Sequence, residues 1–278
     1  MHESIDGKVV VITGGGRGLG HAMAVGLVSV GAKVTITGAR EGQELHETAE
    51  KCRAVGGGNC ILPLRADVTH ASDCERVMEK TYETWGHLHM VINNAGRGMT
   101  YVDADFVKVR PAFWDISNEV WQMIIDTNLN GIFNMSKAAV PYLLSEKWGR
   151  LVNVSTSLVT MQRRGYSPYG SSKWAVEGLT MIMSQDLEDT PITANALLPG
   201  GATDTAMIPG KVGDKSRAGA DGNLFQPEIM VSPVQYLASD LSNARRGDRY
   251  VAKLWDSSLP PEEAAMKSRF PIRRERQY

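Results

Sequence analysis

The sequence predicts an α/β fold in which a doubly wound parallel sheet forms a single domain of 278 residues. Segments with the apolar, β-branched composition of buried strands alternate with segments whose apolar residues recur at helical spacing. This alternation indicates parallel strands joined by helices that cover both faces of the sheet. No internal repeat and no Pro/Gly-rich linker divides the chain, so one domain is expected over residues 1–278.

The expected elements follow one another at short intervals. The first strand, residues 8–13, leads through a glycine-rich turn into a helix that starts near Leu19. Pro141 predicts a kink or break in the long helix that carries it, because proline disrupts a helix interior. Further strands are expected at 33–37, 61–65, 89–92, 150–154, 192–198 and 249–252, and further helices at 43–55, 72–85, 118–147, 171–187 and 233–238.

The turn after the first strand has the spacing Thr13-Gly14-x-x-x-Gly18-x-Gly20. Glycine permits positive φ and close approach of a ligand, and the free N–H groups at a helix start favour a pyrophosphate. The spacing departs from Gly-x-Gly-x-x-Gly, because His21 stands where the third glycine would fall. A flexible surface loop is the alternative, but the order of strand, turn and helix favours dinucleotide binding.

The end of the second strand favours NADP over NAD. An NAD site usually places Asp or Glu here to bind the ribose hydroxyls, whereas this strand ends at Gly38 and Arg40 follows. Arg17 in the glycine turn is a second candidate to bind the 2′-phosphate. Glu41 argues in the other direction, so NAD stays open as the alternative.

Tyr169 and Lys173 are spaced four residues apart in a segment expected to be helical, so they share a face. An ammonium beside a phenol favours the phenolate and lowers the pKa of tyrosine from its usual value of about 10. A tyrosine tuned in this way can exchange a proton near neutral pH, as carbonyl reduction or alcohol oxidation requires. The pair alone fits a solvated helix face better, but the glycine-rich turn upstream favours catalysis.

The motifs occur in an order that resembles the short-chain dehydrogenase/reductase family, in its compact single-domain branch. The resemblance runs from about Lys8 to about Asp240 and implies a Rossmann-type sheet. Each motif is weak by itself, whereas their joint order is specific. After the glycine turn come Asp67-Val68, Asn93-Asn94-Ala95-Gly96, Asn128, a Ser/Thr cluster at a strand end, Tyr169-x-x-x-Lys173 and Pro199-Gly200.

The resemblance implies a role for each matching residue. Tyr169 would donate the proton in reduction and accept it in oxidation. Lys173 would hold the nicotinamide ribose and lower the Tyr169 pKa. Asn128 would hold a water that links Lys173 to solvent, although it could instead only kink its helix or cap a neighbour. The residues expected at the cofactor are Gly14, Arg17, Gly18, Leu19, Gly20, Arg40, Asp67, Val68, Asn94, Ala95, Gly96, Tyr169, Lys173, Pro199, Gly200 and Thr205.

Three consecutive hydroxyl residues follow the strand 150–154, and the family's substrate-binding serine is expected among them. The usual spacing to the tyrosine falls on Thr156, whereas a loop shortened by one residue would bring Ser157 there. Neighbouring strand residues point to opposite faces, so the two cannot reach the same point unless the strand has ended or bulged. Ser157 is slightly favoured because serine is the usual residue, and the other hydroxyls, Ser155 included, would satisfy local backbone groups.

Two long segments are expected to determine the substrate. Residues 97–118 form an insert that is longer than is usual in the family, and residues 205–231 resemble a mobile lid. The aromatic residues of the insert either face the substrate or pin the insert to the body. They are Tyr101, Phe106, Phe113 and Trp114.

The C-terminal region departs from the family pattern. The usual glycine-rich turn is missing after the last strand, where the chain reads Arg249 to Asp256. Residues 256–278 are expected to form a tail, with the basic stretch 273–276 in solvent. Since many relatives build a tetramer interface in this region, a homodimer is as consistent with the sequence as a homotetramer.

Composition and charge argue against other classes of protein. The chain has 30 Lys and Arg against 31 Asp and Glu, so no positive excess favours a nucleic-acid partner. No apolar run reaches the roughly 18 residues of a membrane-spanning helix, and no export signal is recognisable at the N-terminus. The odd number and wide spacing of Cys52, Cys60 and Cys74 argue against disulfides or a metal site and favour the cytoplasm.

The sequence thus predicts a cytoplasmic oxidoreductase that acts on a small carbonyl or alcohol with NADP, or NAD, and without a metal. A nucleotide-binding dehydratase or epimerase is an alternative. Such relatives, however, usually carry a Thr-Gly-x-x-Gly-x-x-Gly turn and a larger C-terminal domain. A catalytically silent NAD(P)-binding regulator is a second alternative, to which only the unsettled serine position points.

Overall fold

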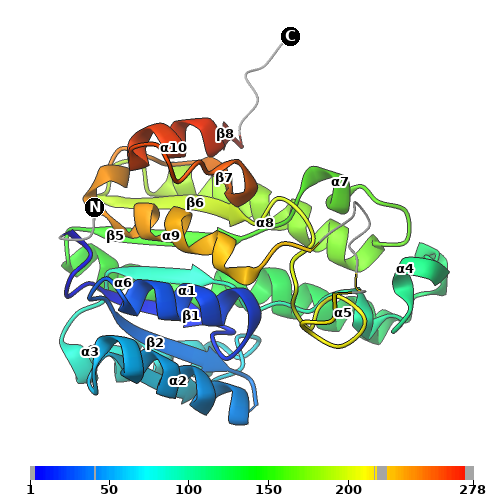
Figure 1. Cartoon of the computed structure of the whole chain (residues 1–278), viewed down its shortest axis with the longest axis horizontal. Coiled ribbons are helices and arrows are strands. Elements are labelled where there is room, and N and C mark those ends of the chain that lie inside the picture. Colours follow the sequence, from blue (N-terminus) through cyan, green and yellow to red (C-terminus); the bar gives the residue numbers. More distant parts are fainter. Residues whose placement is uncertain (1–3, 41, 216, 218–223, 273–278) are drawn as a thin grey trace.

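The computed structural model describes residues 4–40, 42–215, 217 and 224–272, and it confirms the expected α/β fold. One eight-stranded sheet runs through the molecule, with helices on both of its faces (Figure 1). Glu41 and the basic stretch 273–276 lie outside the described residues. None of the helices in the described part of the chain has the length and apolar composition of a membrane span.

The strand order across the sheet is β3-β2-β1-β4-β5-β6-β7-β8, with only β8 antiparallel to its neighbour. The order reverses between β1 and β4, and doubly wound sheets bind ligands at the carboxyl ends of the strands beside such a reversal. All seven strands expected from the sequence are present to within one residue. The strands are β1 Val9–Thr13, β2 Lys33–Gly38, β3 Ile61–Arg65, β4 Met90–Asn93, β5 Gly149–Val154, β6 Ile192–Leu198, β7 Asp248–Val251 and β8 Arg269–Pro271.

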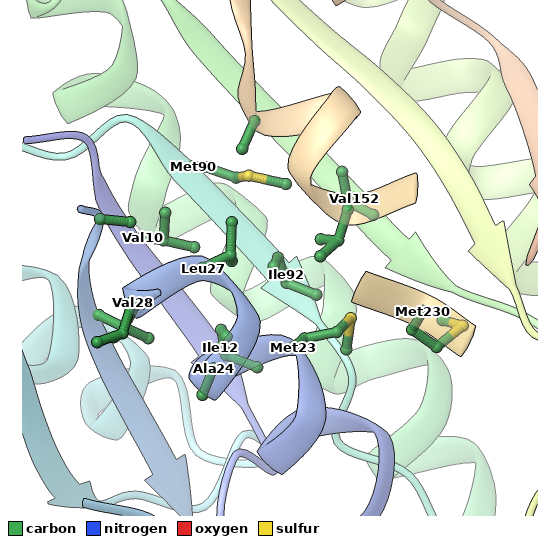
Figure 2. Packing of buried hydrophobic residues seen from close by; sticks show 14 of the residues in the cluster. Val10, Ile12, Met23, Ala24, Leu27, Val28, Met90, Ile92, Val152 and Met230 are labelled. Atoms are coloured by element: carbon green, nitrogen blue, oxygen red, sulfur yellow. The ribbon is translucent and has the colours of Figure 1, made fainter. Parts of the chain in front are cut away.

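Alternate residues of the central strands enter two separate cores. In β1, Val10 and Ile12 face one core and Val11 faces the other. Figure 2 shows the first core, where Met23 and Leu27 of α1 pack towards β1 and β4. Burial on both faces explains why these strands are continuous apolar runs. The first core is covered by α1 Gly18–Val28, α2 Gln43–Gly56 and α9 Val231–Ala238, the second by α3 Ala71–Trp85 and α6 Gly131–Ser145.

The long helix expected over 118–147 is broken, but not at the proline. It consists of α5 Asn118–Ile125, a π-helical turn at Asp126–Asn130, and α6, which continues through Pro141. A break at Pro141 is therefore not found, because the helix continues through the proline. The residues on either side of it, Ala139 and Leu143, are fully buried, and this packing holds α6 together at the proline.

Several short elements gather beyond the carboxyl ends of the strands. They are α4 Phe106–Val109 in the insert, α5, α7 Leu158–Met161 and the start of α8 Ser167–Asp186 (Figure 1, right). Each follows β4 or β5, so the chain leaves the sheet there and returns along α6 or α8. The catalytic tyrosine expected from the sequence thus lies at the edge of the sheet where ligands bind.

The expectation of a C-terminal tail over 256–278 is wrong for its central part. Residues Pro261–Ser268 form helix α10, and Arg269–Pro271 form the antiparallel strand β8 beside β7. Ala264 and Ala265 are buried, and α10 packs on α9. Two small apolar residues give too weak a helical pattern to reveal this element in the sequence.

Candidate functional site

The glycine turn forms a tight cradle at the end of β1. Gly14 has φ +64° and Gly18 has φ +54°, a region of conformational space that favours glycine. A Cβ at position 20 would overlap the carbonyl oxygen of Gly14 and lie 2.6 Å from Nδ2 of Asn94. The first turn of α1 has no acidic residue, so its N–H groups meet no negative side chain there. The turn therefore fits a pyrophosphate, and Leu19 packs inward on the first core.

Asn94 and Ala95 fix this turn to the end of β4. The backbone amides of both donate to Oγ1 of buried Thr13, at 3.0 Å and 2.9 Å. Nδ2 of Asn94 also donates to the carbonyls of Thr13 and Gly14, at 3.0 Å each. The Asn94 side chain thus shapes the cradle from behind, and Thr13 is a residue of this site that the sequence did not single out.

The other residues expected at the cofactor also lie at strand ends. Asp67 and Val68 follow β3, where Oδ1 of Asp67 accepts from the amide and hydroxyl of Thr69. Pro199 and Gly200 follow β6, and Gly200 has φ +87°. The remaining residue, Thr205, belongs to the expected lid. Its Cγ2 would lie 3.0 Å from a Cβ atom placed on Gly18, and Thr205 and Gly18 line the same pocket.

The two arginines expected to bind a phosphate are both exposed. Nη1 of Arg17 lies 3.3 Å from Oε1 of Glu44 on α2. Arg40 lies just beyond Gly38 at the end of β2, the position where the sequence predicts it. The edge of β2 and the glycine turn therefore present positive side chains to the same end of the sheet.

Helix α8 carries Tyr169 in its first turn and Lys173 one turn later. Pro168 is suited to this helix start, since its fixed φ is helical and the missing N–H has no partner there. A Cβ at Gly170 would overlap the Met161 carbonyl, so glycine lets α7 approach α8 closely. Nζ of Lys173 lies 5.9 Å from the centroid of the Tyr169 ring.

The electrostatics of this pair differ from the expectation. Burial raises the pKa of Tyr169 to about 12, while a hydrogen-bonding interaction with the Thr156 side chain opposes the rise. Burial also lowers the pKa of Lys173 to about 8. The lowered Tyr169 pKa expected from the sequence is not found in this arrangement, because burial of the phenol raises the pKa, and the Lys173 ammonium donates to the Val154 carbonyl, 2.7 Å away.

The three hydroxyl residues after β5 have three different partners. Oγ of buried Ser155 donates to Oε1 of Glu177 at 2.9 Å. The side chain of Thr156 interacts with Tyr169. Ser157 caps α7, where its Oγ accepts from the Thr160 amide at 3.2 Å. The structure thus brings Thr156, rather than the slightly favoured Ser157, to the tyrosine, because the strand ends at Val154 and the Ser157 side chain is used to cap α7.

Asn128 lies in the π-helical turn and is fully buried. Its Oδ1 accepts from the amide of Arg97 at 2.8 Å, and its Nδ2 donates to the Arg97 carbonyl at 3.0 Å and to Oγ of Ser172 at 2.9 Å. A Cβ at Gly96 would lie 3.3 Å from the same Oδ1. The side chain of Asn128 therefore joins the start of the insert to α8.

The aromatic residues of the insert divide into two groups. Phe106 is buried and packs edge-on against Tyr166, with ring centroids 5.4 Å apart. Phe113 and Trp114 contact each other but remain 70% and 74% exposed. Phe106 thus pins the insert to the loop before α8, whereas Phe113 and Trp114 leave apolar rings on the surface of the insert.

A model of the family described as "short chain dehydrogenase" matches residues 8–215, well over half of the chain. The chain belongs to the short-chain dehydrogenase family. It is accordingly an oxidoreductase that uses a nicotinamide cofactor, and the glycine cradle described above fits the pyrophosphate of such a cofactor.

Individual relatives agree with this assignment. A short-chain type dehydrogenase/reductase from Picea abies is 32% identical, over 85% of this chain and 87% of its own length. A 3-oxoacyl-[acyl-carrier-protein] reductase from Pseudomonas aeruginosa is 30% identical, over 85% and 92%. The crystal structure of a short-chain type dehydrogenase/reductase from Mycobacterium marinum is 25% identical and superimposes with a TM-score of 0.76, covering 89% of this chain and 94% of that one.

Sequence reasoning missed two charged residues near Tyr169 and Lys173. Glu177 is 2% exposed on α8, and Arg249 of β7 donates to it from Nε at 2.9 Å and from Nη2. A signal for Glu177 was present, because it continues the four-residue spacing of Tyr169 and Lys173 along one helix face. No comparable signal identifies Arg249, which lies 72 residues further along the chain.

Proposed function

We propose that the chain reduces a carbonyl compound, or oxidises the corresponding alcohol, with Tyr169 as the group that transfers the proton. The observation that carries this proposal is the convergence of Tyr169, Lys173 and Thr156 at the end of β5, which is separated only by β4 from β1 and its glycine cradle. The bound nicotinamide would supply or accept the hydride.

The side chains suit the reducing direction. With a pKa of about 12, Tyr169 keeps its proton at neutral pH and can donate it to a developing alkoxide. The Thr156 hydroxyl would donate a second hydrogen bond to the same substrate oxygen. Lys173, with a pKa lowered to about 8, would hold the nicotinamide ribose and return a proton to the tyrosine. Asn128 would support Lys173 through water.

Replacing Tyr169 with phenylalanine tests this role. Removal of a general acid lowers turnover by about 10²- to 10⁴-fold, while the ring that packs on the cofactor side is kept. Turnover is followed by NADPH or NADH absorbance, and cofactor affinity by fluorescence titration. Undiminished turnover in Tyr169→Phe would rule out this tyrosine as the acid.

We further propose NADP as the preferred cofactor. Gly38 leaves no carboxylate at the end of β2, and exposed Arg40 follows it. Arg40→Asp should therefore weaken NADPH binding and improve NADH binding. A ratio of kcat/KM for the two cofactors that did not change would refute the role of Arg40.

The substrate class can be approached from the relatives. Since similar chains are named 3-oxoacyl-[acyl-carrier-protein] reductases, a 3-oxoacyl thioester is a rational first compound to test. The exposed Phe113 and Trp114 also favour an apolar or ring-containing carbonyl. A screen would compare acetoacetyl-coenzyme A, an aromatic ketone, a ketosteroid and a ketose, each with NADPH and with NADH.

We also propose a cytoplasmic homodimer or homotetramer. A groove between α6 and α8 is lined by apolar side chains, of which Phe133 is 49% and Ile182 55% exposed, and a second copy would cover it. The three cysteines are free and buried, as suits a reducing compartment. Sedimentation equilibrium measures the number of chains in the assembly. Cell fractionation identifies the compartment that contains the protein. A monomer, or a secreted protein, would contradict the proposal.

A further inference from the structure

The end of β5 and the two residues that follow it are tied to successive turns of α8. Nζ of Lys173 donates to the Val154 carbonyl at 2.7 Å, and Oγ of Ser155 donates to Oε1 of Glu177 at 2.9 Å. Tyr169, one turn before Lys173, interacts with Thr156. The pairs along this seam are thus Val154 with Lys173, Ser155 with Glu177, and Thr156 with Tyr169. Two of them involve proposed reactive groups, whereas the pair Ser155 and Glu177 has no part in the proposed chemistry.

Glu177 is held on its other side by β7. Arg249 donates from Nε to Oε1 at 2.9 Å and from Nη2 to Oε2, so the pair is bidentate. The side chain of Glu177 is 2% exposed and that of Arg249 13% exposed. A bidentate guanidinium fixes both carboxylate oxygens in direction as well as distance. Strand β7 therefore sets the orientation of the Glu177 side chain, and through it the orientation of Ser155.

Burying such a pair is a weak source of stability, because the loss of hydration offsets most of the attraction between the charges. Its geometric effect is specific, since Ser155 is the residue between Val154 and Thr156. A shift of Ser155 would move the acceptor of Lys173 and the hydroxyl beside Tyr169 together. Glu177 is also one helical turn from Lys173, on the same face of α8.

We propose that Ser155, Glu177 and Arg249 form a positioning network that holds Lys173 and Thr156 in register with Tyr169. This inference rests on the proposed function of Tyr169. The three residues touch no reacting atom, so they are positioning residues rather than catalytic ones. The network would determine how accurately the proton-transfer groups are placed, whereas the glycine cradle determines cofactor binding.

Ser155→Ala and Glu177→Gln test the network with small changes of shape. We expect kcat with acetoacetyl-coenzyme A and NADPH to fall on the order of 10- to 100-fold, as for displacements of about 1 Å, with little change in the KM for NADPH. Arg249→Met should reproduce the loss, and Arg249→Lys, which keeps the charge, should restore part of it. Because the carboxylate of Glu177 is removed while Arg249 stays, the pH profile of kcat should also shift in Glu177→Gln.

Two variants at other buried polar sites serve as matched controls. Ser242 is a buried serine that accepts from Arg150 at the other end of the sheet, and buried Asp248 pairs with Arg269 at 3.1 Å. Ser242→Ala and Asp248→Asn should lower the melting temperature about as much as the network variants, without lowering kcat. A fall in kcat that followed melting temperature across all variants would overturn the positioning role.

A second readout needs no substrate. In protein labelled with ¹³C at the lysine ε-carbon, the Lys173 signal is assigned from its loss in Lys173→Arg. Ser155→Ala and Glu177→Gln should change its chemical shift and titration midpoint, and the two controls should not. An unchanged signal together with unchanged kcat rejects the network even if Tyr169→Phe is inactive. Full activity of Tyr169→Phe instead rejects the proposed function, independently of this signal.

Discussion

Lys173 and Arg150 are both buried cations, and they lie at opposite ends of strand β5. The ammonium of Lys173 makes one hydrogen bond within the described residues, to the Val154 carbonyl. The guanidinium of Arg150 donates from each of its three nitrogens. Its acceptors are Ser242, the Gly149 carbonyl and Asn243. Burial lowers the pKa of Lys173 to about 8 and that of Arg150 to about 10.

The surroundings of Arg150, at the amino end of β5, contain further interaction partners. Trp148 stacks between Lys8 and Arg150, with the two charged groups 3.9 Å and 3.8 Å from its ring centroid. Nε1 of the same tryptophan donates to Asp240 at 2.9 Å. Lys8 and Arg150 thus both have partners within the protein, and the arrangement is a structural one.

Three residues of types that often bind metals also lie at the amino end, and the hydrogen bond made by one of them indicates a structural role. His87, His89 and Glu146 lie close together there. Nδ1 of His89, however, accepts from the Val9 amide at 3.0 Å, which places the proton of the neutral ring on Nε2. The ring therefore offers no free lone pair to a cation. Lys173, by contrast, has three N–H bonds and one acceptor among the described residues, so it keeps unused donors at the carboxyl end, where we propose the functional site.

The largest effect on turnover should come from a change at Thr156, at the carboxyl end of β5. Thr156→Val keeps the shape but removes the hydroxyl beside Tyr169, and loss of one such donor lowers kcat by about 100-fold or more. Ser157→Ala, its neighbour, should lower stability by about 1 kcal/mol through loss of the α7 cap and leave kcat nearly unchanged. Steady-state kinetics and thermal unfolding of both variants measure this. The opposite pattern would assign the catalytic hydroxyl to Ser157.

A smaller effect on turnover is expected from Gly20→Ala, through cofactor affinity. The new Cβ would overlap the Gly14 carbonyl, and relief of such overpacking takes about 1–3 kcal/mol. This corresponds to a dissociation constant for NADPH raised roughly 5- to 150-fold. Gly58, in the loop between α2 and β3, has open space around its Cβ position, so Gly58→Ala is the control. Equal affinities of the two variants would show that the cradle tolerates a side chain.

The smallest effect on turnover is expected from a change at His89. This change should instead alter how stability depends on pH. Burial, with Lys8 acting in the same direction, lowers the pKa of His89 to about 4, below the usual value of 6.5. Between pH 6.5 and 4 the unfolded chain therefore binds a proton that the folded chain does not, and stability falls as the pH falls. At pH 4 the loss is about 2–3 kcal/mol, since one pKa unit corresponds to about 1.4 kcal/mol.

His89→Gln removes this proton linkage, so its free energy of unfolding should change less over the same pH range. Urea unfolding at pH 4, 5 and 6.5 compares the variant with the wild-type chain, and kcat at pH 7 should be the same for both. Identical pH dependence of the two unfolding curves would show that His89 is protonated alike in the folded and unfolded states.

Much of the fold could be predicted from the sequence because its signals are local. Central strands such as β1 and β4 are buried on both faces, so each is a continuous apolar run that can be recognised without its neighbours. The glycine turn and the pair Tyr169 and Lys173 are also local, since their geometry is that of one turn and one helix. Elements with few apolar residues, such as α10 and β8, are stabilised by contact with α9 and β7 and were not recognised.

The sequence by itself determined the sheet, the glycine cradle and the helix face that carries the tyrosine and lysine, because each depends on spacing within one segment. Only the tertiary structure decided which hydroxyl meets Tyr169, where the long helix breaks, and that Glu177 is paired with Arg249. These features depend on where β5 ends relative to α7 and α8, and on which residue of β7 lies opposite α8. Such distances are set by packing between segments far apart in the chain, which no local pattern records.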